Sequence, residues 1–177
     1  SCSLTDWTVV DGQERILFHA VLEADVYREF RPYHVSPEGG PVERVHDAHG
    51  SQPRLSPDGT RVLFARGGYY DGWERRHYRG PENQDVWLQD RASGAFTRLT
   101  RWAGNDGKAA WLDDRTVLYL SDREDRAVNL YRRSVDEPEP RAVRLTRFTD
   151  RDIHDWALSA DGSTAVLMSW DTLHRLD

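Results

Sequence analysis

The residues best suited to chemistry lie between glycines in the segment 67–81, where aromatic rings alternate with arginines. The candidate binding residues are Trp73, Arg75, Arg76, Tyr78 and Arg79. Guanidinium groups bind carboxylates through two parallel hydrogen bonds, and Trp and Tyr rings supply rigid contact area. This composition predicts a loop that pairs with a peptide carboxylate and holds apolar side chains. In the alternative interpretation, the rings only pack the loop onto its neighbours and the arginines face solvent.

Other possible sites are weaker. His46, Asp47 and His49 are of metal-ligating types, but they lie in a turn and the sequence offers no further ligand beside them, so we expect no metal. The sequence holds no Gly-x-Ser-x-Gly elbow, His-Glu-x-x-His helix or phosphate loop. No carboxylate pair for acid–base work stands out among the 30 acidic residues. We therefore expect neither a catalytic residue nor a cofactor in this chain.

Composition narrows the classes of partner. The chain has 24 basic and 30 acidic residues and a net charge of −6, which opposes binding to nucleic-acid phosphates. No run of eighteen apolar residues is present, so we expect no membrane-spanning helix. The single cysteine, Cys2, excludes an internal disulfide and a zinc site built from cysteines.

The elements that must position the candidate loop are repeated along the chain. Apolar triplets follow Asp-containing turns at intervals of 46 to 55 residues: Ile16–Phe18, Val62–Phe64, Val117–Tyr119 and Ala165–Leu167. A repeat of this length indicates supersecondary modules, none of which can bury its apolar face alone. We expect each triplet to be a strand buried on both faces.

Each repeat contains a four-part phrase. In the second repeat it runs from a strand and Asp-Gly turn (53–59), through the triplet and a strand around Trp87, to a closing Arg98-Leu99-Thr100. Four short strands per unit, joined by Gly, Pro and Asp turns, are typical of a β-propeller blade. An immunoglobulin-like sandwich also has short strands, but it would not repeat one phrase with the same turn chemistry. The sequence predicts an all-β fold made of four-stranded antiparallel blades.

The predicted blades span residues 5–48, 49–102, 103–148 and 149–177, and the last one lacks a closing strand. This makes about three and a half blades, fewer than the four to eight that close most propellers. Either further chain supplies the missing blades, or the N-terminal strand closes an unusual four-bladed ring. We favour the first, because the chain starts without Met in repeat-like sequence, and we expect a partial propeller within a longer protein.

The candidate loop is an insertion between the second and third strands of the second blade. In an antiparallel meander, this connection emerges on the same end of the blade as the link to the next blade. The links 101–108 and 147–154 should therefore share a face with the insertion. They offer polar side chains at Asn105, Asp106, Asp150 and Asp152, which taken singly are explained as solvated turn residues.

The blade phrase at Leu55–Phe64 resembles the motif shared by TolB-like propellers and tricorn proteases. A narrower similarity, to the six-bladed N-terminal propeller of tricorn proteases, covers essentially the whole chain. Its motifs are His77–Gly80, Asp85–Trp87, Ser93–Phe96, Tyr119–Asp122, Phe148–Asp150 and Asp161–Gly162. A departure from the pattern is the very short hairpin within Ala165–His174 of the fourth blade.

The resemblance implies a non-catalytic module of a cytoplasmic, homo-hexameric serine peptidase that degrades short peptides. The propellers of that family are thought to guide substrates in and products out, and its catalytic Ser and His lie far downstream. Its arginine pair that anchors peptide carboxyl termini belongs to a blade link before Ser1, so Arg75 and Arg76 are not given that role.

Two other interpretations share the propeller. One is a TolB-like periplasmic platform for protein interactions, without enzymatic activity. The other is the propeller of a prolyl-oligopeptidase-like hydrolase. The leading hypothesis remains a propeller that guides or gates peptides, with the insertion near a channel mouth and with the missing blades and the catalytic region of the parent chain as its partners.

Overall fold

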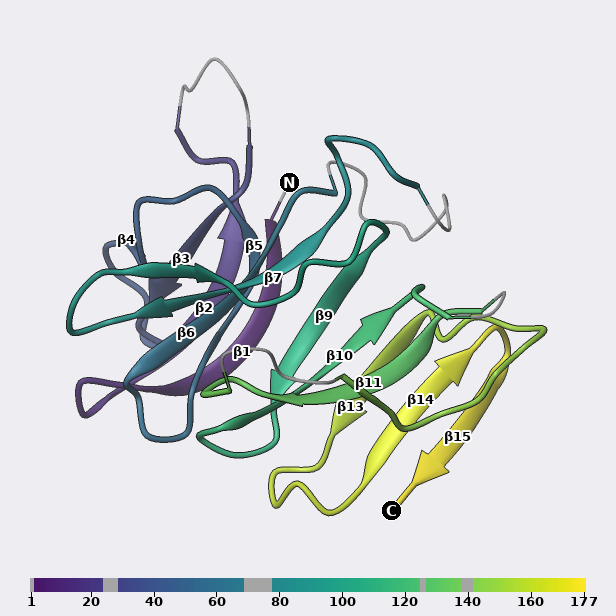
Figure 1. Ribbon diagram of the computed structural model, residues 1–177. Helices are drawn as coiled ribbons and strands as arrows, with labels where there is room; N and C mark the ends of the chain where they lie inside the picture. The colour runs from purple at the N-terminus through teal and green to yellow at the C-terminus, as the bar shows by residue number, and fades with distance from the viewer. Residues whose placement is uncertain (1, 24–28, 69–77, 125–126, 138–141) are drawn as a thin grey trace.

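The computed structural model describes residues 2–23, 29–68, 78–124, 127–137 and 142–177, and the regular structure within these ranges is all β (Figure 1). The first sheet contains β1 (Cys2–Val10), β2 (Gln13–Ala20), β3 (Arg31–Val35) and β4 (Glu43–Arg44). The second contains β5 (Ser51–Leu55), β6 (Arg61–Arg66), β7 (Asp85–Asp90) and β8 (Phe96–Arg98). The third contains β9 (Asp106–Trp111), β10 (Thr116–Ser121), β11 (Asn129–Ser134) and β12 (Val143–Arg144). The fourth contains β13 (Asp155–Leu158), β14 (Ala165–Ser169) and β15 (Thr172–Leu176).

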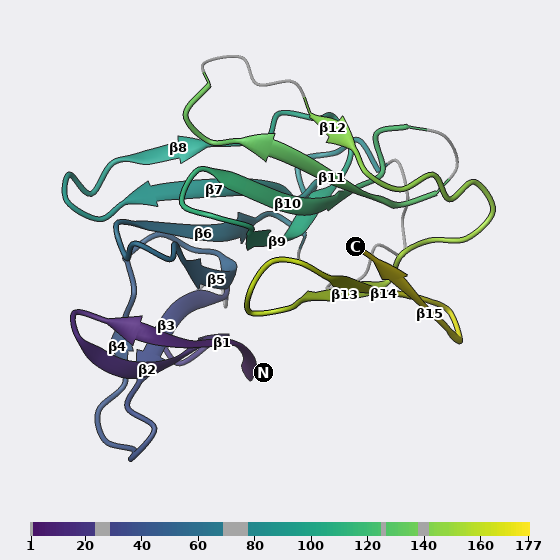
Figure 2. The same ribbon diagram turned by 90° about the horizontal axis from the view of Figure 1, so that it is seen from below.

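In every sheet the strands pair antiparallel in chain order. The four sheets succeed one another around a common axis, with the first strand of each nearest the axis and the last strand outermost (Figures 1 and 2). This arrangement confirms the prediction of β-propeller blades in a partial propeller. Among the described residues, no helix is long and apolar enough to cross a bilayer.

The Asp-Gly turns were predicted because Gly accepts positive φ and Asp binds nearby backbone. In the second blade, Asp58 Oδ1 accepts hydrogen bonds from Ser56 Oγ at 2.6 Å and from the Thr60 N–H at 3.0 Å. Gly59 has a φ of 72°. The turn at 159–164 of the fourth blade repeats these bonds, which explains why the phrase recurs.

The closing phrase Arg-Leu-Thr recurs because its threonine fills one structural role. Thr146 Oγ1 accepts the backbone N–H of Leu130 at 3.0 Å and donates to Asn129 Oδ1 at 2.9 Å. In the second blade, Thr100 Oγ1 likewise accepts the N–H of Val86 at 2.9 Å. Each threonine therefore ties the end of its blade to the third strand.

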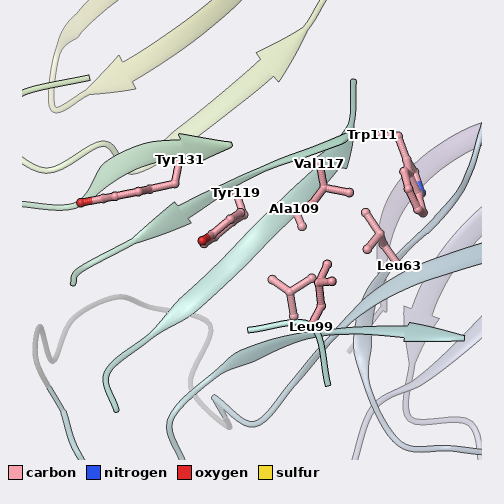
Figure 3. Close-up of a cluster of buried hydrophobic side chains, with 8 residues drawn as sticks. Leu63, Leu99, Ala109, Trp111, Val117, Tyr119 and Tyr131 are labelled. Carbon is pink, nitrogen blue, oxygen red and sulfur yellow. The ribbon is translucent and has the colours of Figure 1, made fainter. Parts of the chain in front are cut away.

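The core lies in the seams between blades. The seam between the second and third blades buries an aliphatic and aromatic cluster (Figure 3): Leu63, Val86, Leu99, Ala109, Trp111, Val117, Tyr119 and Tyr131. A second cluster around Leu118, Leu130 and Leu167 fills the next seam. Burial of this apolar area is what holds one blade against another.

The two-faced burial predicted for the triplets is confirmed for Val62–Phe64 and Val117–Tyr119, but it is wrong for the fourth blade. Val166 and Met168 on the outer face of β14 are 41% and 39% exposed. Their counterparts in the third blade, Leu118 and Leu120, are buried because the fourth blade covers them. No described segment covers the outer face of β14.

Candidate functional site

One end of the propeller carries both the loops between second and third strands and the links between blades. We call this end the link face, and it lies uppermost in Figure 1. The two ends of the insertion in the second blade enter and leave on this face, as the strand order predicts. Its interior, residues 69–77, lies outside the described residues.

The base of the insertion is held closed by backbone contacts. The Gly68 N–H donates to the Glu82 carbonyl at 2.7 Å. Gly67 has a φ of 83°, and a Cβ there would collide with the Asn83 carbonyl. Glycine is therefore required at position 67, both by conformation and by space.

Of the predicted binding residues, Trp73, Arg75 and Arg76 lie outside the described residues, whereas Tyr78 and Arg79 are described. The Arg79 guanidinium carbon lies 5.4 Å from the centre of the Trp102 ring, a cation–π contact. Arg79 is exposed, and Trp102 belongs to the link between the second and third blades. The structure thus joins the insertion to the link that was predicted to share its face.

The Trp102 ring is held in place by a hydrogen bond to a buried carboxylate. Its indole Nε1 donates to Asp122 Oδ1 at 2.7 Å, and the same oxygen accepts the Asn105 N–H at 2.9 Å. Asp122 is fully buried. A Cβ at Gly104 would overlap both Asp122 Oδ1 and the indole nitrogen, so glycine makes room for this bond.

Sequence reasoning did not single out Trp102, and it used Asp122 as part of the family motif Tyr119–Asp122. The available signal was position, because Trp102 is the one aromatic in a link that was already placed beside the insertion. The sequence around Asp122 does not predict that its side chain is buried, because this burial depends on a chain segment 20 residues away.

Three of the four polar link residues serve the fold. Asn105 Oδ1 accepts the Gln84 N–H at 3.0 Å, and Asp152 Oδ1 accepts the Val128 N–H at 2.8 Å at the corresponding place in the next blade. The carboxylate of Asp106 is fully buried. Asp150, by contrast, is exposed and lies 3.8 Å from the guanidinium of its neighbour Arg151.

Two buried ion pairs support the link face from inside. Arg98 contacts Asp85 at 2.6 Å, and Arg123 contacts Asp106 at 2.9 Å. Burial raises the pKa of Asp85 to about 6, against the opposing effect of Arg98. Burial also raises the pKa of Asp106, and the Arg123 guanidinium opposes this shift.

Arg123 also lies over two tyrosine rings, at 5.4 Å from the centre of Tyr119 and 5.1 Å from that of Tyr131. These partners all belong to the third blade, so Arg123 holds β9, β10 and β11 of that blade together. Paired buried charges of this kind stabilise geometry and do not by themselves indicate catalysis.

The fourth blade adds an open depression on the link face. It is lined by Arg151, His154, Met168, Trp170 and Asp171. Trp170 is 67% exposed and has a φ of 54° in a two-residue turn, a position that usually takes Gly or Asn. This turn confirms the short hairpin expected in the fourth blade.

The histidines considered as metal ligands do not converge. His46 is buried against Phe64 and Phe96, with ring centres 4.4 and 5.2 Å away. His49 faces Glu29 at 3.2 Å, and Asp47 pairs with Arg44. In the described part of the chain, no three His, Cys, Asp or Glu side chains are arranged to hold a metal.

Comparison with known proteins gives one family match. The model of the tricorn protease N-terminal β-propeller domain matches residues 2–177. Among curated proteins, none matches the chain by sequence.

Solved structures share the fold at low identity. The tricorn protease crystal structure superposes with a TM-score of 0.74 at 16% identity, covering 98% of this chain and 16% of that one. TolB from Acinetobacter baumannii superposes with a TM-score of 0.64 at 20% identity, and the match covers 93% of this chain and 37% of TolB. A puromycin-hydrolyzing peptidase from Mycobacterium tuberculosis superposes with a TM-score of 0.61 at 14% identity, and the match covers 99% of this chain and 30% of the peptidase. The chain thus spans well under half the length of each of these three proteins.

Proposed function

The chain belongs to the family of tricorn protease N-terminal β-propeller domains, and from this premise we propose that it is a non-catalytic part of a serine peptidase that guides peptides. The observation that carries the proposal is the contact of Arg79 with Trp102 on the link face. It places an exposed guanidinium on an aromatic ring at the base of the insertion.

The chemistry of this contact suits a peptide. A guanidinium that lies over the face of an indole still has N–H donors that point outward in the guanidinium plane, where they can pair with a carboxylate. The bond from Trp102 to the buried Asp122 fixes the ring, so the contact is organised before a ligand arrives. Trp73, Arg75, Arg76 and Tyr78 belong to the same proposed surface.

The exposed apolar faces support the expectation of further blades. Val166 and Met168 on the fourth blade, and Leu4, Trp7 and Val9 on β1, are all exposed. In the inner seams, positions of this kind are buried against a neighbouring blade. We propose that the parent chain supplies blades for both faces, together with a catalytic region, and that it acts as a homo-hexamer in the cytoplasm.

The test is peptide turnover by the full-length protein. Replacing Arg75, Arg76 and Arg79 together by Gln should lower kcat/KM for peptides about tenfold, which corresponds to one charge-assisted contact. Arg115→Gln is the control, because it removes an exposed arginine from the hairpin at the opposite end of the propeller. If the triple variant kept the wild-type kcat/KM, the proposed role of this surface would be wrong.

A second candidate function is a TolB-like interaction platform, and the similarity to the TolB structure favours it as an alternative. A propeller of a prolyl-oligopeptidase-like hydrolase is the third. Absence of peptide hydrolysis by the full-length protein would favour the platform. Hydrolysis that is restricted to bonds after proline would favour the third interpretation.

A further inference from the structure

The inner strands of the second and third blades share an unusual backbone feature. Gln52 in β5 has a φ of 55° and Lys108 in β9 has a φ of 48°. Each lies at the register shift where its strand pairs with the second strand of the blade. Left-handed conformation is costly for residues with a Cβ, and a bulge redirects its side chain.

The redirected side chains connect successive blades. Gln52 Oε1 accepts the backbone N–H of Lys108 at 3.0 Å. Lys108 Nζ donates to the His154 carbonyl at 2.7 Å and to Asp155 Oδ1 at 3.3 Å. Gln52, Lys108 and Asp155 are therefore joined by hydrogen bonds, through the backbone N–H and then the side chain of Lys108, from the second blade to the fourth. We call these three residues the inner rim.

The inner rim lies on the side of the sheets that faces their common axis. Its residues belong to β5, β9 and β13, each of which is the first strand of its sheet and nearest the axis (Figure 2). The Trp156 indole also donates to the Lys108 carbonyl at 2.8 Å, which holds the bulge from the next blade. The left-handed conformation of Lys108 is thus held by hydrogen bonds from the second blade and from the fourth.

The rim offers one donor and one acceptor side by side. An ammonium has three N–H donors, and the bonds to His154 and Asp155 engage two of those on Lys108. The Asp155 side chain is 59% exposed. Its Oδ1 accepts from Lys108 Nζ and from the Trp156 N–H, and its carboxylate has acceptor capacity beyond these two bonds. A peptide main chain presents the complementary pair, a carbonyl oxygen and an N–H.

We propose that the inner rim binds the main chain of an extended peptide, with Lys108 donating to a carbonyl and Asp155 accepting an N–H. Recognition of the main chain is independent of side chains, so the rim holds peptides of different sequence equally. This inference rests on the proposed function and places a second contact on the axis side, apart from Arg79.

The proposal is tested on the full-length protein by titration calorimetry with pairs of N-acetylated pentapeptides of unrelated sequence, each of which keeps a free C-terminal carboxylate. In each pair, one member carries an N-methyl group on its central amide, which removes a single N–H donor. Lys108→Met and Asp155→Ala should each raise Kd about tenfold for every sequence. N-methylation should weaken binding to the wild type about tenfold and have little effect on the Asp155→Ala variant, which has no side-chain acceptor.

A control variant away from the rim and a labelling measurement on the wild-type protein complete the test. Arg115→Gln removes an exposed arginine at the opposite end of the propeller and should leave every Kd unchanged. Lys108 is the only lysine of the 177-residue chain, and peptide mapping after reductive methylation of the full-length protein reports on this lysine separately. Saturating peptide should slow its methylation in the wild-type protein about tenfold.

The inference is overturned if the variants bind as the wild type does, if they lose affinity for one sequence only, or if peptide leaves the methylation of Lys108 unchanged. Arg79→Gln separates this failure from that of the proposed function. If Arg79→Gln weakens binding and Lys108→Met does not, only the inner rim is wrong. If no peptide binds the wild type, both proposals fail.

Discussion

Trp102 donates its indole N–H to the buried carboxylate of Asp122, and this bond joins the link between two blades to the end of β10. The bond has a consequence on each side of the ring. On the outer side it fixes the surface on which Arg79 lies. On the inner side it satisfies a carboxylate that would otherwise lose a donor inside the protein.

We expect Trp102→Phe to remove this donor while keeping an aromatic ring at the surface. The free energy of unfolding should fall by about 1–2 kcal/mol, because a buried carboxylate loses one hydrogen bond. Urea unfolding of the 177-residue chain measures the change. Arg79→Gln is the control, since it alters the outer side of the ring only and should change stability by less than about 0.5 kcal/mol. Equal losses in both variants would contradict this account.

The closing threonines give a second prediction. In Thr146→Val the backbone N–H of Leu130 loses its buried acceptor, so the unfolding free energy should fall by about 1–3 kcal/mol. Thr146→Ser keeps the hydroxyl and should recover most of the loss. Thr97→Val makes the same replacement at an exposed position of β8 and should have little effect. A loss of the same size at position 97 would show that the hydroxyl of Thr146 is not the cause.

The parts of the fold that could be predicted are those that each blade repeats. The turn around Asp58 recurs in the fourth blade and the closing Thr100 recurs in the third, because each satisfies the same local hydrogen bonds there. Their spacing therefore predicts four-stranded blades. The link face followed from strand order alone.

The contacts between blades could not be predicted, because no local pattern encodes them. The left-handed bulges at Gln52 and Lys108 lack the Gly or Asn that usually marks such a conformation. Neighbouring blades fix them instead. His19 Nδ1 accepts the Gln52 N–H, and the Gln52 side chain and the Trp156 indole bond to the backbone of Lys108. Asp122 resembles an exposed turn residue until the link folds over it.

The outer face of β14 gives a third prediction. Val166→Glu combined with Met168→Glu should make the 177-residue chain more soluble and leave its unfolding midpoint nearly unchanged, because both side chains are exposed. Leu118→Glu combined with Leu120→Glu makes the same change at the corresponding buried positions. That variant should unfold, since buried unpaired charges cost several kcal/mol. Sedimentation and circular dichroism distinguish the two outcomes. Unfolding of the first variant would show that its face is already covered.

The pH dependence of stability should reflect two buried groups that act in opposite directions. Burial lowers the pKa of His46 from its ordinary value of 6.5 to about 4. As the pH falls from 6.5 to 4, the unfolded chain binds a proton at this position and the folded chain does not, so stability is lost. Burial raises the pKa of Asp85 from 3.8 to about 6. As the pH falls from 6 to 3.8, the folded chain holds a proton that the unfolded chain releases, so stability is gained.

Because the two windows overlap, the effects largely cancel in the wild type, and substitution of either group should reveal the other. In Asp85→Asn the His46 effect is no longer opposed by Asp85, and it should lower stability by about 2 kcal/mol between pH 6.5 and 4.5. In His46→Leu the Asp85 effect is no longer opposed by His46, and it should raise stability by about 2 kcal/mol over the same range. Urea unfolding at several pH values measures both, and every other titrating group is common to the two variants. The profiles should therefore diverge as the pH falls, and parallel profiles would contradict the assignment of these two residues.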